Sequence, residues 1–270
     1  MSKRVKRISV FLAFTFGLMY LSHGLIAFLL ETTSLAWGSF PFNTLMIIGG
    51  GAPAFAALYM VWTMYDKREK RVYWERTYLY QAPWFWWVVT LLSPLLIGLI
   101  ANLIYYGGWW NPDVQTGQII AFPLTLVTMI VFGGMEELGW RGILQDTLSK
   151  HVSLPIIGVV IGLLWGLWHG PLFLIDEFAH YHFDFSTYLL STIAYSLLLT
   201  LVVYKTNSIL LAILLHAGMN AFGNLGFGIP MEVHAGLRIY LLLLSLVLVL
   251  MLHWVDRDKH FPRNAGVSRS

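Results

Sequence analysis

The sequence contains no cysteine and few charged residues, and each shortage excludes a class of protein. Without cysteine the chain forms no disulfide and has no thiolate to act as a nucleophile or a metal ligand. Only 11% of its 270 residues are charged, whereas about a quarter of the residues of a soluble domain are charged. The net charge is only +3, and most basic residues can be assigned to the ends of apolar segments. We therefore expect neither a soluble domain nor a nucleic-acid partner.

Hydrophobic residues make up 57% of the chain, which is typical of a polytopic membrane protein. Runs near or above ~18 apolar residues predict helices that cross the bilayer. We expect eight of them, at residues 9–30, 43–64, 84–107, 118–147, 154–175, 186–204, 207–223 and 237–255. We find no internal repeat, low-complexity tract or linker. The sequence therefore predicts an all-α membrane helical bundle in which residues 1–270 form a single integral domain.

Lysine and arginine are unevenly divided between the segments that connect these spans. Cytoplasmic loops of membrane proteins carry an excess of both residues. If the N-terminus lies inside, all of the 17 basic residues except Arg238 fall in inner segments or inner span ends. This asymmetry predicts a multi-pass protein of the cell membrane with both termini in the cytoplasm. It also accounts for the basic stretch DKREKR, which we interpret as an inner loop.

Two adjacent glutamates and an arginine lie in the segment FGGMEELGWRG, at the end of an apolar run. A charge near the centre of a membrane helix costs ~2.5–3.5 kcal/mol, so such groups are functional candidates by default. Glu137 and Arg141 stand four residues apart and can pair along one helix face. Glu136 points about 100° away and has no cation at the same spacing. We therefore interpret Glu137 and Arg141 as supporting residues and Glu136 as a candidate general base.

Two further polar pairs follow the same spacing in later apolar segments. Trp165 and His169 share one face of the fifth predicted span, and His216 and Asn220 share one face of the seventh. Each pair occupies a helix whose other residues are almost all apolar. Polar side chains in such helices face the interior of a bundle or a wet cavity. The two pairs are therefore candidates for the same site as Glu136.

Distances along the helices indicate that these side chains can meet. Glu136 precedes Lys150 by 14 residues, and His169 follows Pro155 by 14 residues. At a rise of ~1.5 Å per residue both lie about 21 Å from the turn that joins their helices. In an antiparallel pair of helices, Glu136 and His169 therefore lie at the same depth. His216 lies about 14 Å along its helix by the same reasoning, so we expect one shared cavity.

Such a group of side chains suits the hydrolysis of a peptide bond. Glu136 with His169 can deprotonate a water molecule for attack on a carbonyl, and His216 and Asn220 can donate hydrogen bonds to the resulting oxyanion. Alternatively, His169, His216 and Glu136 can bind a metal such as zinc. Each of these groups can instead be purely structural. Glutamate and arginine can form an ion pair that holds the bundle together, His169 can be a core histidine, and His216 and Asn220 can form hydrogen bonds between helices.

The three motifs resemble those of the CPBP intramembrane metalloprotease family, also called the Abi or CAAX-protease-and-bacteriocin-processing family. Its signatures are Glu-Glu-x-x-x-Arg, Phe-x-x-x-His and His-x-x-x-Asn/Asp. Here they read EELGWR at residues 136–141, WGLWH at 165–169 and HAGMN at 216–220. The order and spacing match, and the resemblance covers residues 120–225, the expected catalytic core. The sequence contexts WRG and WHGPLF are similar to the bacterial branch, for which a prenylated substrate is not the default.

The resemblance implies a helical-bundle protease that hydrolyses a membrane-associated or hydrophobic peptide. It carries water activation onto Glu136 and His169, and the oxyanion hole onto His216 and Asn220. Trp165 stands where the family motif has phenylalanine, which affects the shape of the pocket more than its chemistry. Members of the family differ in whether they depend on a metal. The resemblance therefore leaves the zinc alternative open.

Two other functions compete with proteolysis. The first is a non-proteolytic protein of bacteriocin self-immunity, or a membrane scaffold, that binds a partner with the same fold. The second is a small-solute transporter, which we disfavour because the charged groups have no repeat-related counterpart. Outside the motifs, His180 and His182 can bind a metal on the outer face, but we expect a solvated loop there. His23 has no polar helical neighbour and is expected in the core.

Overall fold

The apolar runs of the sequence form helices throughout the computed structural model, which describes residues 2–33, 35–78, 81–109, 111 and 114–257. No strand occurs within these ranges. In chain order the elements are α1 (Lys3–Thr32), α2 (Phe40–Gly50), α3 (Ala52–Met64), α4 (Lys67–Tyr78), α5 (Trp84–Tyr106), α6 (Thr116–Phe132), η1 (Gly134–Glu136), α7 (Glu137–Gly139), η2 (Trp140–Gln145), α8 (Asp146–Leu148), α9 (Leu154–Trp168), η3 (Gly170–Leu174), η4 (Ala179–His182), α10 (Phe185–Thr206), α11 (Ile209–Phe222), η5 (Gly223–Phe227) and α12 (Ala235–Arg257). The predicted all-α class is confirmed.

Seven segments of the described chain are long and apolar enough to cross a membrane. The helices α2 and α3 pass the same test together, although they are bent by 59° at their junction. They correspond to the predicted span 43–64. The break follows from the sequence GGGAPA: α2 ends at Gly50, and Pro53 occupies the first turn of α3, where its missing N–H costs nothing. The prediction of about eight spans is therefore confirmed, with one of them broken.

The predicted span 118–147 corresponds to the candidate span Thr116–Leu148, but this segment is not one uninterrupted α-helix. The α-helix α6 ends at Phe132, and a 3₁₀ turn, a short α segment and a π-helix follow it. Gly133 has φ −135° and ψ −60°, and a Cβ atom there would collide with the amide of Asn220. A Cβ on Gly134 would come 2.6 Å from the carbonyl oxygen of Ile213. The two glycines thus let the broken segment approach α11 closely and turn Glu136 away from the axis of α6.

The fifth predicted span, 154–175, also contains a break. The helix α9 ends at Trp168 with His169 as its C-cap, and a 3₁₀ helix begins at Gly170. Pro171 lies at the start of that 3₁₀ helix, and proline cannot donate the hydrogen bond that would continue α9. His169 therefore sits at a helix end and not in a continuous helix.

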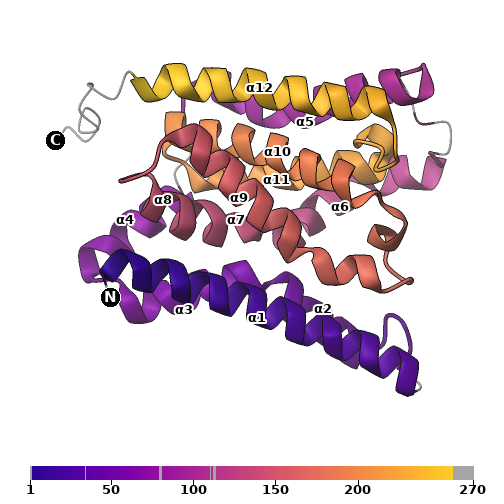
Figure 1. Ribbon diagram of the computed structural model, residues 1–270, viewed down its shortest axis with the longest axis horizontal. Coiled ribbons are helices and arrows are strands. Elements are labelled where there is room, and N and C mark those ends of the chain that lie inside the picture. Colours follow the sequence, from indigo (N-terminus) through magenta and orange to yellow (C-terminus); the bar gives the residue numbers. More distant parts are fainter. Residues whose placement is uncertain (1, 34, 79–80, 110, 112–113, 258–270) are drawn as a thin grey trace.

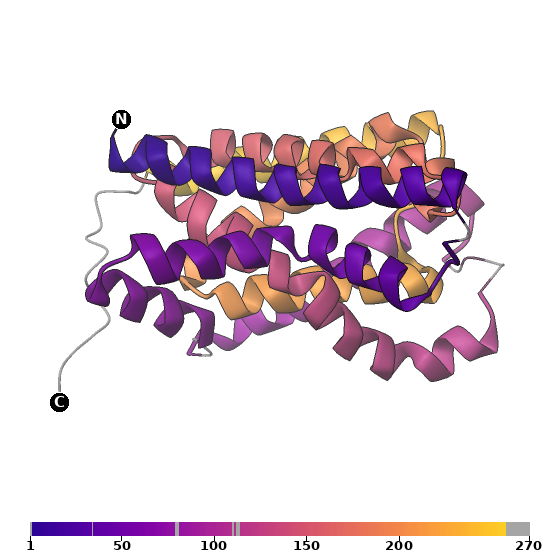
Figure 2. The same ribbon diagram turned by 90° about the horizontal axis from the view of Figure 1, so that it is seen from below.

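The helix α10 lies at the centre of the bundle. Figure 1 shows α9, α10 and α11 between a layer formed by α5 and α12 and a layer formed by α1, α2 and α3. Within the apolar window of α10, 78% of the residues are buried, against 11% for the segment that contains α6. In Figure 2, α6 leans away from the other helices. The core therefore supports α9 to α11, while α6 is mostly open to its surroundings.

Glycines allow α9 to pack tightly on α10. A Cβ atom added to Gly162 would lie 2.6 Å from the Cα atom of Ile193, and one added to Gly158 would lie 2.7 Å from Leu197. Small residues at such contacts are common where membrane helices approach closely. This packing fixes the end of α9, and with it the position of His169.

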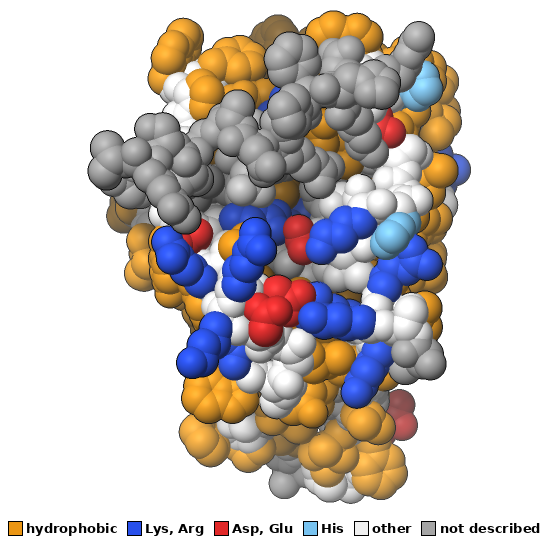
Figure 3. All heavy atoms as spheres, turned by 90° about the vertical axis from the view of Figure 1, so that its left-hand side faces the viewer, with side chains coloured by type: hydrophobic (Ala, Val, Ile, Leu, Met, Phe, Trp, Pro, Cys, Tyr) orange, Lys and Arg blue, Asp and Glu red, His pale blue; other side chains and the backbone are white. Residues whose placement is uncertain are grey.

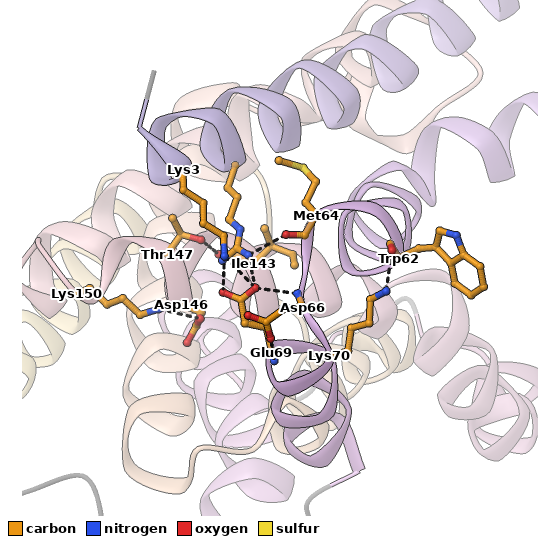
Figure 4. A network of polar contacts seen from close by, with 11 residues as sticks. Lys3, Trp62, Met64, Asp66, Glu69, Lys70, Ile143, Asp146, Thr147 and Lys150 are labelled. Carbon is orange, nitrogen blue, oxygen red and sulfur yellow. Dashed lines mark hydrogen bonds and ion pairs between the residues drawn. The ribbon is translucent and has the colours of Figure 1, made fainter.

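Basic side chains gather at one end of the molecule, which we call the basic end: the start of α1, α4 and α8. Figure 3 looks at this end and shows lysine and arginine side chains around a few acidic ones. Lys3 contacts Glu69 at 3.1 Å (Figure 4). Arg7 contacts the same carboxylate at 2.6 Å, so both residues tie α1 to α4. The start of α1 and the end of α12 both lie at this side in Figure 1. Their cytoplasmic location stays a prediction, and the basic residues beyond 257 lie outside the described ranges.

The basic stretch DKREKR is not the loop that we expected, because it begins the helix α4 at Lys67. Asp66 and Glu69 form a reciprocal cap: the N–H of Glu69 donates to Asp66 at 2.8 Å, and the N–H of Asp66 donates to Glu69 at 3.1 Å. Burial alone would raise the pKa of Glu69, but hydrogen bonds from Arg7, Asp66 and Lys3 lower it to about 2. The helix α4 thus begins at an acidic cap within a basic stretch.

Candidate active site

One cavity brings the predicted site residues together. This central cavity has a volume of about 510 Å³, and its lining includes Glu136, Trp165, His169, His216 and Asn220. The glutamate comes from the broken segment after α6, Trp165 and His169 from the end of α9, and the last two from α11. Three segments that are distant in sequence therefore contribute to one site.

A tryptophan holds the carboxylate of Glu136. The indole Nε1 of Trp165 donates a hydrogen bond of 2.9 Å to Glu136 Oε2. The residue is only 7% exposed, and no lysine or arginine within the described ranges forms an ion pair with it. One carboxylate oxygen is thus fixed by the indole. Glu136 lines the cavity, so a bound water molecule or substrate can come next to this residue.

The adjacent Glu137 belongs to a separate, fully buried network. Its Oε1 lies 2.8 Å from His216 Nδ1, and its Oε2 lies 3.2 Å from Arg141 Nε. Arg141 Nη2 also donates to Ser196 Oγ at 3.3 Å. The side chains of the three charged partners are at most 2% exposed. The i, i+4 pair that the sequence predicted is present, and Glu137 additionally holds the ring of His216.

This network determines which nitrogen of His216 faces the cavity. Because Nδ1 is engaged by Glu137, only Nε2 is available to a bound molecule. A Cβ atom added to Gly133 would lie 3.5 Å from that Nε2 and would collide with Asn220. Both polar groups of α11 therefore border the glycine at the break after α6, where the absence of a side chain leaves room.

The ring of His169 is held in a comparable way. Its Nδ1 lies 2.9 Å from the carbonyl oxygen of Trp165, and a carbonyl only accepts, so Nδ1 carries the proton. The remaining Nε2 then has a free lone pair, as a general base requires. Trp168 packs edge-on against the ring at 4.6 Å, and His180 stacks on it at 5.8 Å. The imidazole is therefore fixed in both tautomer and orientation.

Sequence reasoning missed three contributions to this cavity. We expected Trp165 to support the site through the shape of the pocket, but its hydrogen bonds were not foreseen: it links Glu136, through its indole, to His169, through its carbonyl. The expectation of a solvated loop is wrong for His180, which is half-buried and lines the cavity with Tyr188. His182, in contrast, is exposed as expected. The return of this loop over His169 depends on tertiary packing, and no sequence signal indicates it.

His23 is a core residue, as predicted, but it also reaches the cavity. It is 1% exposed, and its Nδ1 lies 3.2 Å from the carbonyl oxygen of Met19 and 3.1 Å from Ser22 Oγ. It is among the residues that line the central cavity. Both available partners of Nδ1 come from its own helix, so His23 contributes shape and not an obvious proton acceptor.

A metal ion does not fit these side chains as they are arranged. Catalytic zinc usually has three protein ligands. Within the described ranges, no three His, Asp or Glu side chains are grouped closely enough to hold a metal ion. The chemistry derived below is therefore that of the side chains alone.

Comparison with known proteins adds to this geometry. Residues 118–222 match the type II CAAX prenyl endopeptidase Rce1-like family. The CAAX prenyl protease 2 of Methanococcus maripaludis is 32% identical over 144 residues, which are 49% of this chain and 53% of that protein. The lysostaphin resistance protein A of Staphylococcus haemolyticus is 26% identical over 135 residues, which are 49% of this chain and 36% of that protein. The chain thus matches about half the length of the first relative and about a third of the second.

The family match includes all three motifs and most of the residues that line the central cavity. The residues before 118, including α1 to α5, lie outside it. Over residues 118–222 the chain is therefore similar to the type II CAAX prenyl endopeptidase Rce1-like family, and the three motifs lie within this matched region.

Proposed function

We propose that this protein is an intramembrane endopeptidase that hydrolyses a peptide bond of a membrane-associated or hydrophobic peptide with water as the nucleophile. The observation that carries the proposal is the central cavity, in which Glu136, His169, His216 and Asn220 meet. The family match over residues 118–222 supports the same activity, and we propose residues 120–225 as the catalytic core. The bilayer itself is then a partner, because it presents the substrate.

The first step is the attack of water on the carbonyl carbon of the scissile bond. Glu136 Oε1 and His169 Nε2 are the two groups that can accept a hydrogen bond from this water molecule. Trp165 holds both of them, at 2.9 Å to each, so their relative position is fixed. Glu136 takes the proton as the new C–O bond forms, in the manner of general base catalysis.

The second step is the stabilisation of the tetrahedral intermediate. The amide of Asn220 and Nε2 of His216 can donate hydrogen bonds to the oxyanion. For Nε2 to donate while Nδ1 donates to Glu137, His216 must carry both ring protons. The carboxylate of Glu137 at 2.8 Å is the counter-ion of that imidazolium. Glu137 thus acts through His216 and does not touch the substrate.

The third step is the collapse of the intermediate. The C–N bond breaks, the carbonyl re-forms, and the leaving amine takes the proton that Glu136 accepted from water. The products are a carboxylic acid and an amine, and Glu136 returns to its carboxylate form. All atoms of the water molecule are accounted for, and no other reactant is required.

Purified full-length protein with Glu136→Gln and, separately, His169→Ala tests the proposal on a peptide library in detergent and in lipid vesicles. We expect each variant to lower kcat by about 10²–10⁴, the usual contribution of general acid–base catalysis. Glu75→Gln is the control, because Glu75 is exposed and remote from the cavity. Thermal unfolding verifies that the variants fold. Retention of wild-type cleavage by both variants would contradict the assigned roles.

A second candidate function is binding without proteolysis, as in a self-immunity or scaffold protein. The relative named for lysostaphin resistance favours testing it. The same variants separate the two functions. If the wild-type protein cleaves no peptide, and both variants retain the cellular phenotype of the wild type, the cavity binds a partner and does not hydrolyse it.

A further inference from the structure

We propose that the central cavity takes its substrate from the membrane face opposite the basic end, and that this substrate is a cationic peptide or peptide tail. That the bound peptide is a substrate rests on the proposed function. The side from which the cavity opens does not depend on catalysis and is tested separately.

Two loops at the end of the bundle away from the basic residues border the cavity. Its lining includes Ala179 and His180 from the loop before α10, and Ile229 and Met231 from the loop before α12. We call these loops, residues 175–184 and 228–234, the cavity loops. They are joined to each other, because the N–H of Asp184 donates to the carbonyl oxygen of Met231 at 2.7 Å. Both lie at the end of the molecule opposite the start of α1 and the end of α12 in Figure 1.

Packed side chains separate the cavity from the basic end. Arg141 and Trp168 are at most 1% exposed and Gln145 is 4% exposed. Gln145 also donates to the carbonyl oxygen of Thr200 at 3.3 Å. A second cavity of about 600 Å³ lies at the basic end beside Asp146, and it shares no lining residue with the central cavity. A molecule entering from the basic end therefore meets a closed layer before it reaches Glu136.

The distribution of positive charge assigns the two ends to the two sides of a membrane. Cytoplasmic segments carry the excess of lysine and arginine, and they gather at the basic end (Figure 3). Among the described residues the cavity end holds one such residue, Arg238, which pairs with Asp184 at 2.8 Å. By this rule the cavity loops face the outside of the cell.

A groove along α6 leads to the same half of the membrane. It is lined by residues near the start of α6, including Gln118 and Thr125, and it meets the central cavity at Met129 and Asn224. Since α6 begins at Thr116, at the end of the molecule that carries the cavity loops, an apolar part of a substrate approaching through lipid would come from the outer leaflet.

The charge of the cavity loops indicates the preferred substrate. Asp176 and Glu177 precede Ala179 in one loop, and Glu232 follows Met231 in the other. All three acidic residues are exposed. None of the three lines the central cavity itself; they lie on the loops beside it. Charges of one sign around a cleft attract ligands of the opposite sign and raise their rate of association by about 10–10³ at low salt. Positively charged peptides should therefore bind better than negatively charged ones.

Cysteine labelling tests the side of access, because the natural sequence has no cysteine. Single variants Ala179→Cys and His182→Cys mark the cavity loops, and Arg68→Cys marks the basic end; all three positions are exposed. A membrane-impermeant maleimide is applied to intact cells that produce the full chain, and again after permeabilisation. We expect at least tenfold more labelling of the loop variants than of Arg68→Cys in intact cells, and equal labelling afterwards. Labelling of Arg68→Cys alone in intact cells would overturn the proposal.

Paired peptides test the charge preference. Two peptides with the same apolar centre are flanked by three lysines or by three glutamates and incubated with the purified protein. We expect a KM at least threefold lower for the lysine-flanked peptide at low salt, a smaller difference at high salt, and a smaller difference in Glu232→Gln. Equal KM values would overturn the charge preference. If neither peptide is cleaved, the proposed function fails, whereas the labelling pattern still decides the side of access.

Discussion

The protein contains two charged networks, each with one glutamate between two basic residues, that lie in different surroundings. At the basic end, Glu69 bridges Lys3 and Arg7, and its side chain is 28% exposed. Beside the central cavity, Glu137 bridges Arg141 and His216, and its side chain is fully buried. The first network is in contact with solvent, and the second is shielded from solvent.

This difference predicts unequal energetic roles. Exposed ion pairs usually contribute ~0–1 kcal/mol, because water already stabilises the separate charges. A buried pair does not need to add much stability, but removing one partner leaves an uncompensated charge that costs ~3–5 kcal/mol. The network at the basic end joins helices, whereas the buried network orients the imidazole that faces the cavity. The predictions below test this contrast.

The largest expected effect is that of Arg141→Met. It removes the guanidinium 3.2 Å from Glu137 and leaves a buried carboxylate, so we expect the free energy of unfolding to fall by about 3–5 kcal/mol. Arg71→Ala is the matched control, because Arg71 pairs at the same i, i+4 spacing with Glu75 in an exposed position. That change should leave the free energy of unfolding nearly unchanged. Thermal or denaturant unfolding in detergent measures both, and equal losses would refute the contrast.

Trp165→Phe has the next largest expected effect. Phenylalanine keeps the aromatic packing and the backbone carbonyl that holds His169, but it removes the indole donor 2.9 Å from Glu136. We expect kcat for peptide cleavage to fall about tenfold, which corresponds to ~1.4 kcal/mol, with little change in stability. Trp62→Phe, at an 81% exposed position, is the control. An unchanged kcat would show that the indole has no part in positioning Glu136.

His180→Ala should have a smaller effect, because His180 acts through the ring of His169. We expect cleavage to slow about threefold, and His180→Phe to restore most of the rate, since the stacking at 5.8 Å is aromatic. His182→Ala, in the same loop but exposed, should leave the rate unchanged. A failure of phenylalanine to rescue would instead assign the role of His180 to its nitrogen atoms.

The smallest expected effect concerns pH and the basic end. Hydrogen bonds lower the pKa of Glu69 from 4.5 to about 2, against the opposing effect of its burial. A lowered folded-state pKa adds stability that is complete above pH ~4.5 and is lost as the pH falls toward 2. The difference in melting temperature between the wild type and Glu69→Gln should therefore shrink over this interval. A difference that stays constant from pH 6 to pH 3 would contradict the assignment.

Hydropathy was sufficient to locate the spans, because the bilayer thickness and the apolar composition determine helix length. The predicted span 237–255 and the helix Ala235–Arg257 agree closely. The breaks at Gly133 and after Trp168 were less predictable. Glycine and proline occur in many continuous membrane helices, so only the close approach of α11, which involves Asn220, shows that Gly133 ends α6.

The site was predictable where helix periodicity applies and unpredictable where it does not. The separation of Glu136 from Glu137 follows from the ~100° turn per residue, and the pairing of Glu137 with Arg141 follows from the i, i+4 spacing. The contact between Glu137 and His216 joins residues 79 positions apart, and no local pattern encodes it. The same holds for His180, whose loop folds back over α9.

The most direct test of the account compares two adjacent residues. Glu136→Gln and Glu137→Gln are measured side by side for peptide cleavage and for thermal unfolding, in the same lipid vesicles. We predict that Glu136→Gln lowers kcat by about 10²–10⁴ with an unchanged melting temperature, whereas Glu137→Gln lowers the melting temperature and leaves measurable cleavage by the remaining folded protein. Full activity of Glu136→Gln would contradict the assignment of the general base and, with it, the proposed mechanism.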